Sequence, residues 1–329
     1  MTKSNLINPR HVSMFVTLGL FILLFGTGSV LFYGFFSLQN FWNLFIDNSY
    51  LLIMAVGMTF VIISGGIDLS VGSVLALSTM MTSALLEKAG LPPPVVIFLV
   101  LLMGTVFGFS MGYIIQTFSL PPFIITLAGL YLARGLCYVI SLDTIGITNP
   151  FWHVMARTKI RFFGLFFISP SVVIALAMVA IGMFLSRYSR FGRNIFAIGG
   201  NEQSALLMGL PVALTKISIY AFNGFCSALG GIVFTFYTLS GYALNGKNME
   251  MDVIASVVIG GTLLTGGVGG VLGTVFAVLV YGTIQVLIVF QGTLNAWWTR
   301  IAIGFLFFLV TTLQRIFENR GTGVKQLEK

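Results

Sequence analysis

RYSRFGRNIFAIGGNEQSALLMGLP, which runs from Arg187 to Pro211, is the longest polar interruption in a chain whose two flanking halves are almost wholly apolar. It begins with three arginines and continues through a Gly199–Gly200 pair, which predicts a hinge. Because it separates two apolar halves, this stretch predicts a long loop of about 187–211 on one side of a membrane.

The second part of the stretch carries the signals of a short helix. Asn201 is a good N-cap, because its side-chain oxygen can accept from the backbone N–H of Gln203 or Ser204. Glu202 places negative charge at the positive end of the helix dipole, and Gly209 suits the left-handed residue after the last turn. The proline that follows prevents continuation, so the predicted helix is roughly 12 Å long.

The apolar side chains of this helix are Ala205, Leu206 and Met208. Two interpretations are open from the pattern alone. Another protein could hold the helix as a projecting knob, or the helix could lie on its own membrane domain.

The composition excludes a soluble fold. Of the 329 residues, 57% are hydrophobic and only 8% are charged, whereas a soluble domain carries about 25% charged residues. A pI near 9.7 would suggest nucleic acid in a soluble chain. Here the basic residues lie at the ends of apolar spans, so membrane orientation and anionic lipid explain them better than nucleic acid.

The apolar runs predict an all-α polytopic membrane protein with about ten transmembrane helices in a single domain, 1–329. Each run is near the ~20 residues that a bilayer requires. The predicted spans are 12–36, 48–64, 69–87, 95–116, 121–141, 165–186, 212–240, 252–265, 270–291 and 296–315.

Lys and Arg predict the orientation. If the N-terminus is cytoplasmic, an even number of spans also places the loop 187–211 and the C-terminus in the cytoplasm, and that side collects ten Lys and Arg against six outside. Three of the outer cations, Arg157, Lys159 and Arg161, share one loop. They are either a solvated basic loop or a docking patch for an acidic partner surface.

The chain also contains an internal repeat. Residues 64–76, SGGIDLSVGSVLA, align with residues 265–277, TGGVGGVLGTVFA, in a shared pattern [ST]-G-G-[IV]-x4-G-[ST]-V-x-A. An ancient duplication explains the match better than chance, and transport proteins often carry repeats whose broken helices meet near the substrate path. The span count makes the copies a parallel pair at inside turns, and a re-entrant break in either copy would change that.

A few polar residues inside the apolar spans are candidates for a transport path or gate. Asp68 and Arg134 are charges that must face protein or water, since a charge at the bilayer centre costs roughly 2.5–3.5 kcal/mol. Asp68 could cap the next helix with Ser70 or line a path, and Arg134 could bind backbone carbonyls or a sugar hydroxyl. Further candidates are Ser73 and Asn223, which could line a polar route, and Phe123, which could stack on a sugar ring, gate the route, or simply face lipid or the core.

The sequence offers no site for chemistry. It has no G-x-x-x-x-G-K-[ST] phosphate loop, no cluster with metal-ligand spacing and no nucleophile–base pair. We therefore expect no catalytic residue, cofactor or metal in this chain. A single intramembrane Asp gives little support for ion coupling, so the driving force is expected to come from elsewhere.

Four blocks in order resemble the membrane subunits of ribose-type ABC sugar importers (branched-chain amino acid/ribose-like permeases). They are GGIDLSVGSVLAL (65–77), AIGGNEQSALLMGL (197–210), E-x-D-x-I-A (250–255) and GGTLLTGGVGGVLGT (260–274). Within that family, YALNGKNMEMDVIASVVIGGTLLTGGVG and GTLNAWWTRIAIG look closest to one of two paired permeases of a bacterial galactofuranose importer. Leu206 and Met208 replace an arginine and a serine of the ribose permeases.

The resemblance implies a permease that works with partners. The segment Asn201–Gly209 would be the coupling helix, seated in a cytoplasmic ATPase subunit that binds ATP and Mg²⁺. A periplasmic sugar-binding protein would dock outside, and a second permease, a non-identical paralogue, would complete the pore in a bacterial inner membrane. The alternative is a stand-alone ion-coupled secondary sugar carrier.

Overall fold

A computed structural model describes residues 9–162, 164–295 and 297–327, with side chains described between 14 and 314. Most of the described chain is helical, as predicted. Its helices are α1 (Pro9–Leu31), α2 (Leu38–Asp47), α3 (Ser49–Ile63), α4 (Val71–Glu87), α5 (Pro93–Thr117), α6 (Pro122–Ile140), α7 (Pro150–Arg157), α8 (Pro170–Tyr188), α9 (Arg190–Gly200), α10 (Glu202–Leu207), α11 (Val212–Thr238), α12 (Met249–Ile259), α13 (Val271–Gln291) and α14 (Trp297–Leu327).

Short strands complete the described elements and tie loops together. They are β1 (Ile145–Gly146), β2 (Ile160–Phe162), β3 (Phe166–Ile168) and β4 (Ser240–Gly241). β1 pairs with β4 and β2 pairs with β3, both antiparallel.

Each predicted span coincides with a helix, but the helices differ in length. Seven of the described helices are long and apolar enough to cross a membrane alone, or eight spans if α2 and α3, bent by 60° at their junction, count as one. The remaining two predicted spans correspond to α4, with 17 residues, and α12, with 11 residues. At 1.5 Å per residue, α12 covers only about half of the hydrocarbon core.

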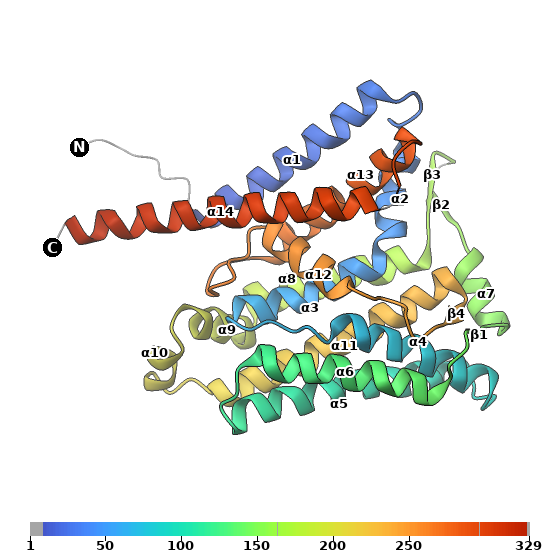
Figure 1. Cartoon of the computed structure of the whole chain (residues 1–329), viewed down its shortest axis with the longest axis horizontal. Coiled ribbons are helices and arrows are strands. Elements are labelled where there is room, and N and C mark those ends of the chain that lie inside the picture. Colours follow the sequence, from blue (N-terminus) through green and yellow to red (C-terminus); the bar gives the residue numbers. More distant parts are fainter. Residues whose placement is uncertain (1–8, 163, 296, 328–329) are drawn as a thin grey trace.

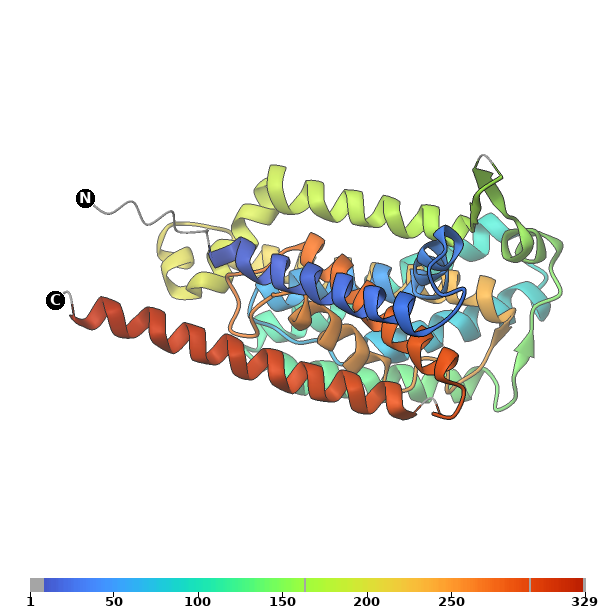
Figure 2. The ribbon, with the colours of Figure 1, turned by 90° about the horizontal axis from the view of Figure 1, so that it is seen from above.

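The core of the bundle is built around α11 and α3. In α3 every residue except Tyr50 is buried, and α11 packs against both α3 and α5. A Cβ at Gly224 of α11 would lie 3.0 Å from Gly108 Cα of α5, so glycine allows these two backbones to touch. Figure 2 shows α8 and α14 on opposite sides of this core.

The bundle has two distinct ends (Figure 1). At one end, the α10 end, lie α9, α10, the first turn of α1 and the last turn of α14. At the opposite end, the hairpin end, lie α7 and the β2–β3 hairpin. The loop 187–211 and the basic loop after α7 therefore lie on opposite sides of the bundle, as the sequence predicts.

The two repeat copies occupy equivalent places in the fold. Each copy is a glycine-rich loop between two helices, α3 and α4 in the first and α12 and α13 in the second. Gly65 and its counterpart Gly266 share a left-handed φ, +83° and +85°. The loops also meet, because Gly267 N–H donates to the Ile63 carbonyl at 2.8 Å. Both loops therefore lie at the α10 end, as a parallel pair requires.

The first copy is both a turn and a re-entrant break. After the turn at Gly65, residues 66–70 run without helix back into the bundle before α4 begins. Asp68 in this stretch contacts Asn223, the twelfth residue of α11, which places it roughly 16 Å from the start of that helix. The start of α4 therefore lies deep inside the bundle.

The predicted Gly199–Gly200 hinge is wrong. Both residues belong to the last turn of α9. Close packing, not backbone flexibility, explains the glycine at position 199, because a Cβ there would overlap the Ile63 carbonyl oxygen of α3.

Candidate functional site

The α10 end carries a capped helix with the predicted local chemistry. Asn201 Oδ1 accepts from the Ser204 N–H at 2.8 Å, and Gly209 has a φ of +76°. Glu202 receives an ion pair from Lys216 of α11 at 2.6 Å, which fixes α10 to the bundle. The backbone N–H of Gln203 was the alternative predicted donor to Asn201, and the Gln203 side chain is exposed. The helix is shorter than predicted, since α10 ends at Leu207.

The apolar side chains of α10 divide between two environments. Leu206 is 64% exposed and Met208 is 68% exposed, as a projecting knob requires. Ala205 is instead fully buried against Ile198 of α9 and belongs to the protein's own packing. Sequence reasoning missed Leu207, which is 88% exposed. Its position next to Leu206 in a capped helix was the available signal.

Behind α10, α9 is joined to both repeat copies. Gly199 packs on Ile63 at the end of α3, and a Cβ on Gly267 would lie 3.0 Å from the Gly200 nitrogen. The last turn of α9 therefore lies in backbone contact with the end of α3, just before the first glycine-rich loop, and with the second glycine-rich loop.

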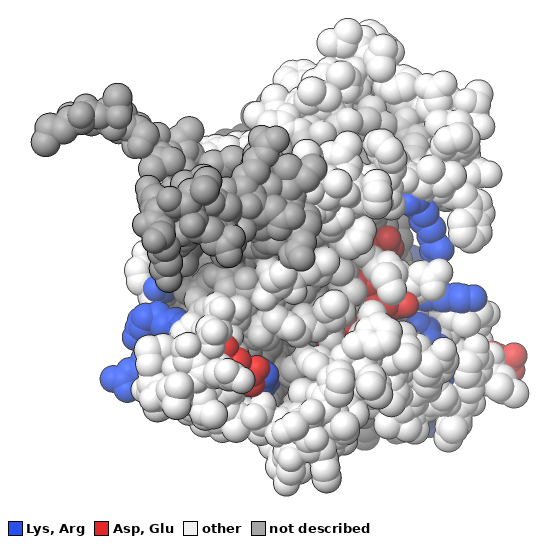
Figure 3. Space-filling view, turned by 60° about the vertical axis from the view of Figure 1, so that its left-hand side comes forward, with Lys and Arg blue, Asp and Glu red and all other residues white. Residues whose placement is uncertain are grey.

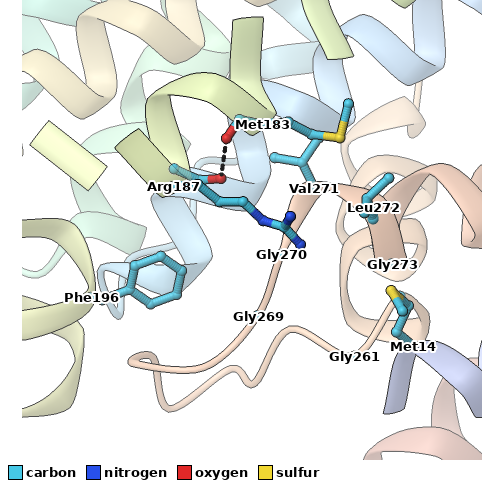
Figure 4. Close-up of a pocket in the computed structure, with 12 residues that line it drawn as sticks. Met14, Met183, Arg187, Phe196, Gly261, Gly269, Gly270, Val271, Leu272 and Gly273 are labelled. Carbon is cyan, nitrogen blue, oxygen red and sulfur yellow. Dashed lines mark hydrogen bonds between the residues drawn. The ribbon is translucent and has the colours of Figure 1, made fainter. Parts of the chain in front are cut away.

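A cavity of about 250 Å³ separates part of α9 from the second repeat copy (Figure 4). Its lining includes Arg187 at the end of α8, Phe196 of α9, Met14 of α1 and the backbone of residues 269–273. The cavity leaves free volume beside the loop that precedes α13, whereas the loop of the first copy is packed.

Four predicted path residues meet in one buried network at the first copy. Asp68 Oδ1 accepts from the Ser70 backbone N–H at 2.8 Å and from its hydroxyl at 2.6 Å, and Asp68 Oδ2 accepts from Asn223 Nδ2 at 2.8 Å. Asp68 is 1% exposed and Asn223 is fully buried. Ser73 donates to the Ser70 carbonyl at 2.7 Å. This arrangement fits a bracket that holds the break before α4 better than an open path.

Phe123 does not join that network. It lies in the first turn of α6 and is 53% exposed.

Arg134 of α6 is brought to a different place, the segment between β4 and α12. Its guanidinium donates to the carbonyls of Ala243 and Asn245, the latter at 2.9 Å. Of the two predicted roles, this geometry shows the backbone contact.

The same face carries charges that sequence reasoning did not assign. Lys247 is exposed, Glu250 and Asp252 lie in the first turn of α12, and Arg300 lies in the first turn of α14. Figure 3 shows acidic and basic side chains gathered on this face within a mostly uncharged surface. Of these charged side chains, Lys247 and Arg300 are exposed, Asp252 is half-buried and Glu250 is buried. Charges beside apolar spans are costly to place in lipid, so this face favours water or another protein. The E-x-D spacing before an apolar run was the signal.

The predicted docking cations lie at the hairpin end. Arg157 ends α7, Arg161 lies in β2, and Lys159 between them is placed 4.5 Å over the Phe167 ring. All three are exposed.

Within the part of the chain that the structure describes, no group of three His, Cys, Asp or Glu side chains could hold a metal ion.

Residues 40–311 match the family described as the permease component of branched-chain amino acid transport systems. The chain is 46% identical over 315 residues to the inner membrane ABC transporter permease protein YjfF of Escherichia coli strain K12, covering 94% of this chain and 95% of that protein. It is 41% identical to the fructose import permease protein FruG of Bifidobacterium longum, covering 90% and 88%. It is 37% identical to the ribose import permease protein RbsC of Bacillus subtilis, covering 82% of each. No solved structure matches the chain.

Proposed function

The chain belongs to the family of branched-chain amino acid transport system permease components, and we propose that it is the permease subunit of an ATP-driven sugar importer. Relatives named as fructose and ribose import permeases support a sugar as cargo. The observation that carries the proposal is the exposed apolar knob of α10 (Leu206, Leu207 and Met208) on a chain without a phosphate-binding loop. Such a surface needs a partner, and the energy source would be that partner.

The knob would seat in a cytoplasmic ATPase subunit, which would bind ATP and Mg²⁺. Residues of the coupling helix would be Asn201, Glu202, Gln203, Ala205, Leu206, Met208 and Gly209, with Ala205 acting as the packing contact to α9. ATP-driven movement of the knob would reach both repeat loops through Gly199, whose backbone touches the end of α3. Opening and closing of the path would follow as rigid-body motion.

The charged face beside α6, α12 and α14 would complete the path with a second permease, a non-identical paralogue. Its polar groups would face a water-filled passage, which explains how they avoid lipid. Arg134 would border this passage, while Asp68, Ser70, Ser73 and Asn223 would hold its wall. Phe123 would gate it from the α10 end.

The orientation follows from the same roles. The α10 end, with both termini, would lie in the cytoplasm of a bacterial cell, and the hairpin end would face the periplasm. Arg157, Lys159 and Arg161 would then meet an acidic surface of a sugar-binding protein.

Galactofuranose is the proposed cargo. Its support is the resemblance of the segments around α12 and α14 to a galactofuranose permease, and the apolar replacements at Leu206 and Met208 separate this chain from ribose permeases.

Purification in mild detergent from the native membrane tests the assembly. We expect mass spectrometry to identify an ATPase subunit and a second permease. The reconstituted complex should import galactofuranose only with ATP and binding protein. Uptake by this chain alone on an ion gradient would instead establish the secondary carrier.

The knob is tested by Leu206→Asp and Glu202→Lys. We expect both variants to lose ATP-driven uptake while the free energy of unfolding changes by less than about 0.5 kcal/mol for Leu206→Asp, because that side chain is exposed. Leu142→Asp is the matched control, since Leu142 is 74% exposed near the opposite end. Normal uptake in both variants would remove α10 from the mechanism.

The docking surface is tested by a triple variant in which Arg157, Lys159 and Arg161 are each replaced by Gln. Binding of the loaded sugar-binding protein, measured by surface plasmon resonance, should weaken roughly tenfold at low salt and less at high salt. Replacing the three arginines of the α10 end is the control. Equal binding by the wild-type and triple variants would make this loop a solvated one.

A further inference from the structure

Two helices begin next to each other deep inside the bundle. Gly72 lies in the first turn of α4, and Glu250 lies in the first turn of α12. A Cβ on Gly72 would lie 2.5 Å from Glu250 Oε2 and 2.6 Å from the Gly246 carbonyl oxygen. The start of α4, the start of α12 and the segment before α12 therefore meet at one point.

Glu250 is the unusual group at this point. Its side chain is 8% exposed, and its Oε2 is the one carboxylate oxygen among the described residues that is buried without a hydrogen-bond partner. Asp68, buried to a similar degree, accepts three hydrogen bonds. A buried polar atom without a partner costs about 1–3 kcal/mol, and more for a charged group. The helix dipole favours an acid in this turn, but that does not require an unpaired oxygen.

A short segment, residues 243–248, lies beside Glu250, because a Cβ on Gly72 would meet both the Gly246 carbonyl oxygen and Glu250 Oε2. The segment runs in tight turns, with left-handed backbone at Gly246 and Asn248, and we call it the cover. Side-chain bonds hold this cover through Arg134, which binds two of its carbonyls, and through Asn245 Nδ2, which donates to Thr79 Oγ1 at 3.2 Å. The cover itself faces outward, because Lys247 is exposed. Lifting this segment would open Glu250 to the charged face.

The chemistry of the opened site selects one class of ligand. The Glu250 carboxylate accepts hydrogen bonds, and the Arg134 guanidinium, once released from the cover, donates them. One negative and one positive group together leave no net charge, so neither an anion nor a cation is favoured. An uncharged molecule with several hydroxyl groups suits both.

We propose that Glu250 and Arg134 form a transient binding site for a sugar at the middle of the path, opened when residues 243–248 move. The inference rests on the proposed function and adds the residues that recognise the cargo and the segment that gates them.

Cysteine accessibility tests the opening. Both native cysteines, Cys137 and Cys226, are buried, so the background reactivity is low. In the complete reconstituted transporter, Glu250→Cys should react with a small hydrophilic methanethiosulfonate slowly without nucleotide and about tenfold faster after vanadate trapping. Met251→Cys is the control, since Met251 is 56% exposed and should react in both states. Equal, slow labelling of Glu250→Cys in both states would overturn the gate.

Uptake tests recognition. With radiolabelled galactofuranose, galactose and ribose as probes, Glu250→Gln should lower uptake about tenfold, the loss expected for one hydrogen bond to a charged acceptor. Glu87→Gln is the matched control at the far end of α4, and its uptake should equal that of the wild type. If the role of Glu250 is purely structural, Glu250→Gln will instead lower the melting temperature and leave uptake per folded molecule unchanged. That result would overturn the inference.

These outcomes distinguish a wrong cargo from a wrong role for Glu250. Wild-type complexes that hydrolyse ATP but import none of the three sugars would remove the proposed cargo and, with it, the sugar contact. Wild-type import with equal import by Glu250→Gln would remove only the role of Glu250.

Discussion

The two repeat copies share one sequence pattern but differ in how firmly their loops are held. Asp68 of the first copy aligns with Gly269 of the second. The first loop is fastened by the hydrogen bonds of Asp68 to Ser70 and Asn223. The second loop has no acid at that position and borders the cavity beside α9. The same pattern therefore produces one loop held by a buried carboxylate and one loop that borders a cavity.

This difference suggests a division of labour. A transporter needs a rigid reference and a moving part, and interfaces between them must change together. The first copy holds the start of α4 through the hydrogen bonds of Asp68. The second copy lies next to α9 and borders the cavity.

Asp68→Ala should have the largest effect on stability, because it removes the hydrogen bonds that hold the loop of the first copy. It leaves the Ser70 N–H and the Asn223 amide without their acceptor in a buried site, and we expect a loss of about 3 kcal/mol in unfolding free energy. Denaturant unfolding in detergent measures it. Ser73→Ala is the control and should cost less, since that hydroxyl bonds only to the Ser70 carbonyl. Wild-type stability in Asp68→Ala would show that the bracket contributes nothing.

Gly199→Ala should have the second largest effect, because it wedges α9 away from the end of α3. The new Cβ would overlap the Ile63 carbonyl and lie 2.5 Å from Gly267 N, so the hydrogen bond that joins the two copies must lengthen. We expect a loss of about 2 kcal/mol, together with a lower ratio of sugar moved to ATP hydrolysed. Gly200→Ala is a close control, because a Cβ there meets nothing within 4 Å. Equal behaviour of the two variants would contradict the wedge.

Acid should have the smallest effect, and it should act at the far end of α4, the helix that follows the loop of the first copy. Glu87 at the end of α4 accepts from the Thr148 N–H and hydroxyl and from the Asn149 N–H. Partial burial alone would raise the pKa of Glu87, but these hydrogen bonds outweigh it and the pKa lies below its ordinary value. The contact therefore stabilises the folded protein at pH values above the ordinary pKa of a glutamate. This stabilisation is lost as the pH falls through the lowered pKa of Glu87.

The melting temperature should consequently fall between pH 7 and pH 3.5 by more in the wild type than in Glu87→Gln. A parallel fall in both proteins would show that other groups account for the acid sensitivity.

Local signals predicted the parts of the molecule that local chemistry decides. The caps at Asn201 and Gly209 depend on residues within one helical turn, so α10 was predictable from its own sequence. The glycine and hydroxyl positions of the repeat were visible as a pattern, and both copies took the same left-handed turn. The ten apolar runs all form helices, because in a membrane the N–H and C=O groups of a single apolar segment can all be hydrogen-bonded only in a helix.

The sequence pattern could not predict which residues of other helices each side chain contacts. Ala205 and Leu206 look alike in the sequence, yet one is buried on α9 and the other is exposed. The glycines before α10 read as a hinge and proved to be a site of close packing.

The sequence by itself determined that this chain is a helical membrane protein with a doubled element and a projecting knob, because hydropathy, caps and repeats act over short distances along the chain. Only the tertiary structure decided that Asp68 Oδ2 has a partner while Glu250 Oε2 has none. Ser70, which is close in the sequence, accounts for the local hydrogen bonds of Asp68, but Asn223, which binds Oδ2, is 155 residues away. Glu250 Oε2 has no partner among the described residues, and burial without a partner is a property of the packed molecule.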